Sequence, residues 1–287
     1  MDQTNKAKGI FHILLAAFGF AAMSLFVRLS GDLPTAEKAF FRNLIAALVA
    51  LYMLKKSGQK LRVKEGCLST LLLRSIAGTI GIYANFWAIG HMAIADANIL
   101  NKLSPFAAIV MSIFIIGEKP NLFETGTVIT AFIGAVFIVK PGAGIASLPA
   151  IVAVLGGIAA GTAYTYVRKL GIMGENKAVI VLFFSAFSCL VSVPRMITGF
   201  VPMSAKQLAC LLMAGIMASV GQLNVTAAYT YAPAKEISVF DYSQVVFAAM
   251  LGFLFFGEMP DAWSFIGYLI IIGTAVIKWY YNLHVKE

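Results

Sequence analysis

Apolar residues follow one another along this 287-residue chain in runs of about twenty, and short polar segments separate the runs. A helix needs about 20 residues to cross the hydrocarbon core of a membrane. The separating segments contain Gly, Pro and Asp, as in 30–34, 117–120 and 257–260, and these residue types end helices. The pattern therefore predicts an all-α integral membrane protein with ten transmembrane helices. Their ranges are 9–29, 35–54, 68–90, 94–116, 122–139, 148–168, 178–198, 207–229, 235–256 and 263–281.

One stretch of this pattern occurs twice. Residues 93–120 read AIADANILNKLSPFAAIVMSIFIIGEKP, and 140 positions later residues 233–260 read PAKEISVFDYSQVVFAAMLGFLFFGEMP. Both copies have an acid near the start, polar side chains soon afterwards and Gly-Glu-x-Pro at the end. Gly81 and Gly221 match at the same offset, which favours two tandem copies of one unit. The predicted units are residues 1–140 and residues 141–287.

Each predicted unit contains five membrane spans, and this odd number has a consequence for topology. The second unit must enter the membrane from the side opposite to the first, so the pattern predicts an inverted-topology repeat. Two similar halves of opposite orientation can exchange conformations. The exchange opens a central site first to one side of the membrane and then to the other, as in secondary transporters.

The composition supports a membrane protein and assigns its charge. Hydrophobic residues make up 60% and charged residues 12% of the chain, against about 45–50% and about 25% in soluble domains, and the mean hydropathy is +0.86. Lys and Arg concentrate in the segments that are cytoplasmic if the N-terminus is inside, above all in the 55–64 loop, with Arg74 counted beside it. This bias places both termini in the cytoplasm. It explains the net charge of +9 without nucleic-acid binding.

Three kinds of chemistry lack a signature in the sequence. The three cysteines, Cys67, Cys189 and Cys210, are far apart in apolar runs and form neither a disulfide framework nor a metal-binding pattern. No G-x-x-x-x-G-K-[ST] sequence occurs, so we expect no bound ATP and no other cofactor. No cluster of His, Asp and Glu indicates an intramembrane enzyme. Facilitated or ion-coupled transport remains.

The chain resembles the EamA-type transporters of the drug/metabolite transporter superfamily along essentially its whole length. The resemblance rests on the ten spans in two halves, the Gly-Glu-x-Pro that closes the fourth span of each half, and Arg42 within AEKAFFRNLIAAL in the second span. It implies a central cavity lined by the third, fourth, eighth and ninth spans. It also implies movement of small metabolites, often amino acids or their relatives, and often export.

The most visible acids of the repeat have two interpretations. Asp96 and Glu236 lie in the first turns of their helices, where a carboxylate complements the helix dipole; a proton or substrate site at the cavity mouth is the alternative. Glu118 and Glu258 follow the C-terminal ends of the same helices, where the helix dipole disfavours a carboxylate, so each needs a partner. Lys119 is one option for Glu118. We expect the two glutamates to hold the loop to the next helix.

Polar side chains within the two repeated spans are the better site candidates. Asn98, Asn101 and Lys102 share one face of the fourth span, and Asp241 and Gln244 share one face of the ninth. A charge inside a span costs about 2.5–3.5 kcal/mol on insertion scales, so it normally faces the protein interior or water. A buried interhelical hydrogen bond is the alternative, worth about 0.6 kcal/mol.

The expected depths of the charged groups separate them into two layers. Counted from the acids at the helix starts, Lys102 lies about 9 Å below the outer surface and Asp241 about 7–8 Å above the inner one. The two then differ in depth by about 13 Å across a core of about 30 Å, which argues against a direct salt bridge. Arg42, about 12 Å deep, shares the level of Lys102 unless its side chain extends to the interface.

Aromatic and amide side chains complete the predicted lining of the cavity, since ligand pockets are mostly apolar with a few polar groups. Tyr83, Asn85 and Trp87 lie in the third span, Asn224 in the eighth and Tyr242 in the ninth. Trp and Tyr near the ends of spans are more often anchors at the membrane interface.

These observations together predict a secondary transporter in the cytoplasmic membrane that moves small polar metabolites, such as amino acids or related carboxylates, by alternating access. Lys102, Asn98 and Asn101 would hold the acidic end of the ligand with help from Arg42, and Asp241 and Gln244 its polar or cationic end. Asp241 could also carry a coupled proton. A nucleotide-sugar or lipid-linked sugar carrier and an uncoupled channel are the alternatives. The expected partners are a small molecule and the lipid bilayer, and a monomer would suffice.

Overall fold

The computed structural model describes residues 3–56, 58, 62–117, 120–139, 147–231 and 238–284. All regular structure over these residues is helical. The elements are α1 (Gln3–Leu29), α2 (Thr35–Lys56), α3 (Leu68–His91), α4 (Ile94–Asn101), α5 (Ser104–Ile115), α6 (Leu122–Val139), α7 (Leu148–Ile172), α8 (Lys177–Gly199), α9 (Ala205–Tyr231), the 3-10 helix η1 (Ser238–Tyr242), α11 (Ser243–Phe256) and α12 (Ala262–His284).

Two of the ten predicted spans depart from a continuous α-helix. The fourth is divided into α4 and α5 by Lys102 and Leu103, and the ninth begins as η1 before it continues as α11. Pro105 explains the first break, because it lies at the start of α5 and has no amide proton to continue the hydrogen-bond ladder of α4. The equivalent positions of the two halves are therefore irregular in both.

The protein is a multi-pass membrane protein. Over the described residues, eight segments are long and apolar enough to cross a membrane: the α4–α5 and η1–α11 segments and the helices α1, α6, α7, α8, α9 and α12. Large apolar side chains are exposed on their outer faces, for example Phe114 at 77% and Leu254 at 69%, as expected for surfaces in contact with lipid. The remaining long helices, α2 and α3, contain Arg42 and Arg74.

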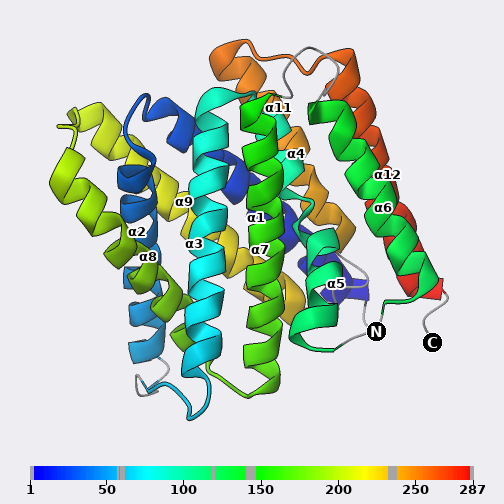
Figure 1. The fold of residues 1–287 in the computed structure, drawn as a ribbon, viewed down its shortest axis with the longest axis horizontal. Helices are drawn as coiled ribbons and strands as arrows, with labels where there is room; N and C mark the ends of the chain where they lie inside the picture. The colour runs from blue at the N-terminus through cyan, green and yellow to red at the C-terminus, as the bar shows by residue number, and fades with distance from the viewer. Residues whose placement is uncertain are drawn as a thin grey trace.

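The helices pack in pairs that join the two halves of the chain. α1 lies along α9, α3 along α7, α2 along α8 and α6 along α12. In Figure 1, α2 and α8 lie on one side of the bundle, α6 and α12 on the other, and α3 and α7 between them. The start of α1 and the end of α12 lie at the same end of the bundle. The largest buried apolar cluster likewise combines both halves, with Phe86, Leu103 and Ile271 among its members.

The helix α7 packs against the broken fourth span without intervening side chains. A Cβ atom at Gly157 would lie 2.7 Å from the carbonyl oxygen of Leu100, and one at Gly161 would lie 2.5 Å from that of Ser104. Small residues allow membrane helices to approach this closely, and the close contact supplies the packing that holds them together. The two glycines thus fix the position of the break between α4 and α5.

We predict that Gly161→Ala destabilises the protein by about 1–3 kcal/mol, because an added methyl group overpacks the contact with α5. Gly171→Ala in the same helix is the matched control, since no atom lies within 4 Å of a Cβ at that position. Denaturant unfolding in detergent measures both changes. Equal stability of the two variants would contradict a packing role for Gly161.

Candidate functional site

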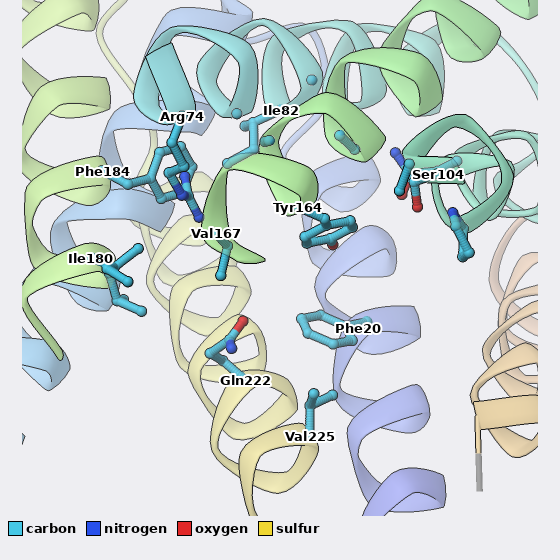
Figure 2. A pocket seen from close by; sticks show the side chains of 18 of the residues that line it. Phe20, Arg74, Ile82, Ser104, Tyr164, Val167, Ile180, Phe184, Gln222 and Val225 are labelled. Atoms are coloured by element: carbon cyan, nitrogen blue, oxygen red, sulfur yellow. The ribbon is translucent and has the colours of Figure 1, made fainter. Parts of the chain in front are cut away.

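A cavity of about 1230 Å³ lies between the two halves of the chain. It is larger than the 300–1,000 Å³ of typical small-molecule pockets. Figure 2 shows part of its lining, with Phe20 from α1, Gln222 from α9 and Tyr164 from α7 around the same space. Its described lining includes six cationic side chains and two carboxylates, namely Arg42, Arg74, Lys102, Arg168, Lys177, Lys278, Glu124 and Asp241. The cavity therefore favours an anionic ligand.

The cavity extends to the end of the bundle where the chain begins and ends. Its lining includes Glu124 near the start of α6, Lys177 at the start of α8 and Asn282 near the end of α12. These helix ends lie at the same end of the bundle as the start of α1 (Figure 1). At the opposite end, the contacts of Glu258 described below connect α1, α3, α4 and α11.

Six of the eleven predicted site residues line the cavity, and five lie elsewhere. Those in the lining are Arg42, Asn85, Asn101, Lys102, Asp241 and Gln244. Those outside the lining are Tyr83, Trp87, Asn98, Asn224 and Tyr242. The hydroxyl group of Tyr83 pairs with Ser192 Oγ at 2.8 Å, and Asn224 Oδ1 pairs with His12 Nδ1 at 2.7 Å. Trp87 stacks on the histidine one turn later, with 4.1 Å between ring centroids.

Lys102 and Asp241 form an ion pair across the two breaks, which the depth estimate did not predict. Lys102 Nζ donates a hydrogen bond to Asp241 Oδ2. The hydroxyl group of Tyr242 donates to the carbonyl oxygen of Lys102 at 3.3 Å, so the two irregular segments contact each other directly. The side chains of Lys102 and Asp241 are 11% and 26% exposed. Pairing lowers the cost of two charges inside the membrane.

The prediction of two separate layers was wrong because α4 begins beside the body of α11 and not beyond its end. The N–H of Ile94, the first residue of α4, donates to Glu258 Oε2 at 2.9 Å. Ile94 also packs in one buried apolar cluster with Ala248, which lies about two turns before the end of α11 at Phe256. α4 therefore starts beside the body of α11, below its end. With eight residues, α4 is only about 12 Å long, and its break meets that of the ninth span.

A buried amide pair lies behind the ion pair. Asn98 is 1% exposed, and its Oδ1 accepts hydrogen bonds from Gln244 Nε2 and from Ser24 Oγ. Its Nδ2 donates to the carbonyl oxygen of Ile94 at 2.8 Å. Asn98 therefore orients Gln244, which lines the cavity, and connects α1 with both broken spans.

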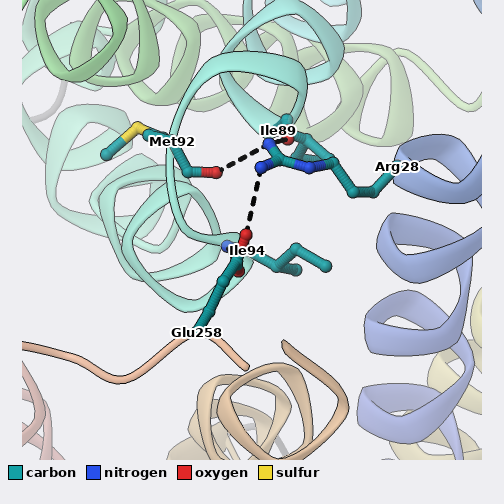
Figure 3. A network of polar contacts seen from close by, with 5 residues as sticks. All are labelled: Arg28, Ile89, Met92, Ile94 and Glu258. Carbon is teal, nitrogen blue, oxygen red and sulfur yellow. Dashed lines mark hydrogen bonds and ion pairs between the residues drawn. The ribbon is translucent and has the colours of Figure 1, made fainter. Parts of the chain in front are cut away.

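Glu258 joins four helices (Figure 3) at the end of the bundle opposite the start of α1 (Figure 1). Its Oε1 accepts a hydrogen bond from Arg28 Nη2 at 3.1 Å, and its Oε2 accepts the Ile94 N–H. Arg28 Nη1 also donates to the carbonyl oxygens of Ile89 and of Met92, the latter at 3.0 Å. The carboxylate thus lies at the N-terminus of α4, where it complements the helix dipole.

The other conspicuous acids of the repeat have different partners or lie outside the description. Asp96 is in the first turn of α4, as predicted, and its Oδ1 accepts a hydrogen bond from the Tyr268 hydroxyl group of α12 at 2.6 Å. Glu118, with its predicted partner Lys119, and Glu236 lie outside the described residues. Asp96 thereby ties α4 to α12.

Arg74 lines the cavity, although the sequence assigned it to the cytoplasmic loop charges. It lies in the second turn of α3, on the face that also presents Gly78, Ile82 and Asn85 to the cavity. Its guanidinium group lies over the ring of Phe184, at 3.7 Å from the ring centroid. A single cation within an apolar run is the same signal that identified Lys102, and it could have identified Arg74.

No group of three or more His, Cys, Asp or Glu side chains within the described ranges is placed to hold a metal ion.

Comparisons with known proteins identify the relatives of this chain. A family model described as the EamA-like transporter family matches residues 7–140 and again residues 147–279. The pseudopaline exporter CntI of Pseudomonas aeruginosa is 33% identical over 93% of this chain and 94% of its own length. A riboflavin transporter of Vibrio cholerae is 25% identical over 92% and 90%. A crystal structure superposes with a TM-score of 0.64 at 15% identity, over 98% of this chain and 99% of that one, which shows a shared fold.

We predict that Arg28 and Glu258 stabilise the protein cooperatively. Interhelical hydrogen bonds in membranes average about 0.6 and reach about 1.7 kcal/mol, and this pair is charged, so we expect a coupling energy of about 1 kcal/mol. A double-mutant cycle with Arg28→Gln and Glu258→Gln, followed by unfolding in mixed detergents, measures it. Arg195→Gln, which changes an exposed arginine of α8, should be additive with Glu258→Gln. Additivity of both combinations would contradict the coupling.

Proposed function

Because the chain belongs to the EamA-like transporter family, we propose that this membrane transporter exports small carboxylate-bearing metabolites across the cytoplasmic membrane by alternating access. The observation that carries the proposal is the meeting of the broken fourth span and the 3-10 start of the ninth at the Lys102–Asp241 ion pair inside a large cavity. Broken helices occur inside membranes where they line a cavity, and transporters use them to bind substrates and ions near the middle of the bilayer.

The proposal includes ten membrane crossings in two inverted repeats, residues 1–140 and 141–287. The two successive matches to one family model support this division. The helix contacts support it as well, because the contact of α1 with α9 corresponds to that of α7 with α3 when the halves are exchanged. Gly81 and Gly221 are 140 positions apart in the sequence. Gly81 of α3 faces the backbone of α7 and Gly221 of α9 faces α1, so the two glycines lie in the two corresponding helix contacts.

The position of the cavity and the name of one relative support the proposed direction of transport. An even number of crossings agrees with the start of α1 and the end of α12 at one end of the bundle (Figure 1), and the loop charges favour the cytoplasm for that end. The cavity reaches this end, whereas the Arg28–Glu258 contacts connect the helices at the other end (Figure 3). The structure then corresponds to an inward-open state, from which an exporter would load its substrate, and the pseudopaline exporter among the relatives supports this direction.

The charges of the cavity select the class of substrate. The cationic lining attracts a carboxylate of the ligand, and Lys102, between α4 and α5, is the side chain that we expect to bind it. Asp241 Oδ1 is buried and has no hydrogen-bond partner among the described residues, so it is available to an ammonium or N–H group of the ligand. Pseudopaline, the compound named for one relative, is therefore the first substrate to test, and riboflavin the second.

The same ion pair offers a means of coupling transport to protons. A substrate carboxylate that binds Lys102 displaces Asp241, and a proton on Asp241 has the same effect because it removes the charge that holds Lys102. Either event weakens the contact between the two breaks. The substrate and the proton then each favour the conformation in which the two segments are apart over the one in which they are in contact. Such a difference in binding free energy between two conformations is required for any ligand-driven change.

Transport into inside-out proteoliposomes tests the function and the coupling together. We expect the full-length protein to accumulate labelled pseudopaline at a rate that depends on an imposed pH gradient. Asp241→Asn should remove the dependence on the gradient, because the amide cannot take up the proton. Asp32→Asn, at an exposed position of the turn between α1 and α2, is the matched control and should retain it. A gradient effect of equal size in the two variants would remove Asp241 from the coupling role.

A further inference from the structure

Two arginines from neighbouring helices face the cavity, and neither forms an ion pair with a carboxylate of the described residues. Arg42 of α2 and Arg74 of α3 both belong to the lining. Buried nitrogen atoms on both, Nε of Arg42 and Nε and Nη1 of Arg74, have no hydrogen-bond partner among the described residues. The hydrogen bond that Arg42 makes, from Nη1 to Asn43 Oδ1 at 2.7 Å, goes to a neutral amide.

This arrangement is costly unless an anion joins it. A guanidinium group is always charged in proteins and has five donors in a rigid fork. Buried donors that lack an acceptor carry a desolvation penalty, and two like charges on adjacent helices repel each other. The carboxylate of Asp241 is already paired with Lys102. The two arginines are thus prepared for an acidic group that comes from a ligand.

The surrounding side chains hold Arg74 in position toward the cavity. Its guanidinium group stacks on Phe184, and the absence of a side chain at Gly78 makes room for both, since a Cβ there would lie 2.7 Å from Arg74 Nη1 and 2.8 Å from the Phe184 ring. Buried polar atoms of two other lining residues, Asn85 Oδ1 and Ser185 Oγ, also lack a partner among the described residues. The region has the unsatisfied groups of a ligand subsite.

A tyrosine connects this region with the ion pair. Figure 2 shows Arg74 and Phe184 on one side of the cavity, Ser104 on the other, and Tyr164 between them. Tyr164 is 57% exposed and lies within electrostatic reach of both guanidinium groups and of Asp241. A ligand that touches Lys102 and Asp241 at one end therefore passes Tyr164 and reaches the arginines at its other end.

We propose that Arg42 and Arg74 form a second anion subsite, so that the substrate carries at least two carboxylates, one for Lys102 and one for the arginine pair. The inference rests on the proposed function, which supplies a carboxylate-bearing ligand, and it adds a requirement for a second acidic group. Bidentate contacts between guanidinium and carboxylate groups supply both energy and orientation. The subsite distinguishes such compounds from ordinary amino acids with a single carboxylate.

Binding of simple dicarboxylates to the purified full-length protein tests the subsite without knowledge of the natural substrate. The probes are the unbranched dicarboxylates from glutarate to suberate, each compared with its own monoamide, which has the same shape and one charge less. Isothermal titration calorimetry should give at least one dicarboxylate a Kd about tenfold lower than that of its monoamide, as expected for one charged hydrogen-bonded group. Equal affinities for every pair, including no binding by either member, would overturn the proposal.

Variants assign the preference to the two arginines. Arg42→Gln and Arg74→Gln should each remove most of the dicarboxylate preference, because the dicarboxylate loses more affinity than its monoamide, whereas Arg74→Lys should retain part of the preference because the charge remains. Arg195→Gln, outside the cavity lining, should retain all of it. Without ligand, the two glutamine variants should melt at or above the wild-type temperature, since an unpartnered buried charge is removed. A lower melting temperature with unchanged preference would indicate a structural role and overturn the proposal.

The outcomes separate this inference from the proposed function. Transport of a labelled substrate without any preference for dicarboxylates would contradict the second subsite and leave the transporter assignment in place. A dicarboxylate preference that depends on the arginines, in a protein that moves no substrate across the membrane, would support the subsite and contradict export.

Discussion

The cost of placing charge and irregular backbone inside a membrane determines much of this structure. Two spans are interrupted at equivalent positions, and each interruption contains an ionisable side chain, Lys102 in one and Asp241 in the other. Irregular backbone and charged side chains are both too costly in contact with lipid, because polar backbone groups and charges there need partners. The breaks therefore meet each other and a cavity. Their ion pair joins the halves of the chain at the place where a polar ligand would bind.

The surrounding helices keep these breaks in position by two different means. Gly157 and Gly161 allow the backbone of α7 to approach α4 and α5 closely, so that close packing defines most of the interface, and Thr165 Oγ1 of α7 adds a hydrogen bond to the carbonyl oxygen of Ala108 in α5 at 3.3 Å. At one end of the bundle, Glu258 and Arg28 add a charged network that satisfies the first amide of α4. Packing contacts of this kind can slide, whereas the network is either formed or broken. Such a two-state contact suits a transporter that opens to one side at a time.

The sequence predicted the elements well because the length of an apolar run is a direct consequence of membrane thickness. Eight of the ten predicted runs correspond to segments that are long and apolar enough to cross a membrane, and the other two correspond to the helices α2 and α3. The depth of the polar residues could not be read from the sequence, since it depends on where α4 begins relative to α11. Ile94 pairs with Glu258 below the end of α11, and this long-range contact leaves no local signal. The estimate consequently separated Lys102 from Asp241, which are in contact.

The candidate site was predictable in part, because a charged residue stands out within an apolar run. Lone charges in apolar runs identified Lys102, Asp241 and Arg42, all of which line the cavity. The side-chain partners of Tyr83 and Asn224 lie on other helices, so helical periodicity could not place them relative to the cavity. Arg74 was missed because its closeness to the 55–64 loop in sequence suggested a cytoplasmic charge. Its place opposite Phe184 depends on the packing of α3 against α8.

The central claim is that one site between the two halves is exposed to each side of the membrane in turn. Counterflow into proteoliposomes tests it most directly, with labelled pseudopaline outside and unlabelled pseudopaline inside the same vesicles. Alternating access predicts that the internal compound accelerates entry of the label and drives its transient accumulation, because the loaded carrier returns faster than the empty one. Entry at the same rate with and without internal substrate, and without saturation, would indicate a channel and contradict the account.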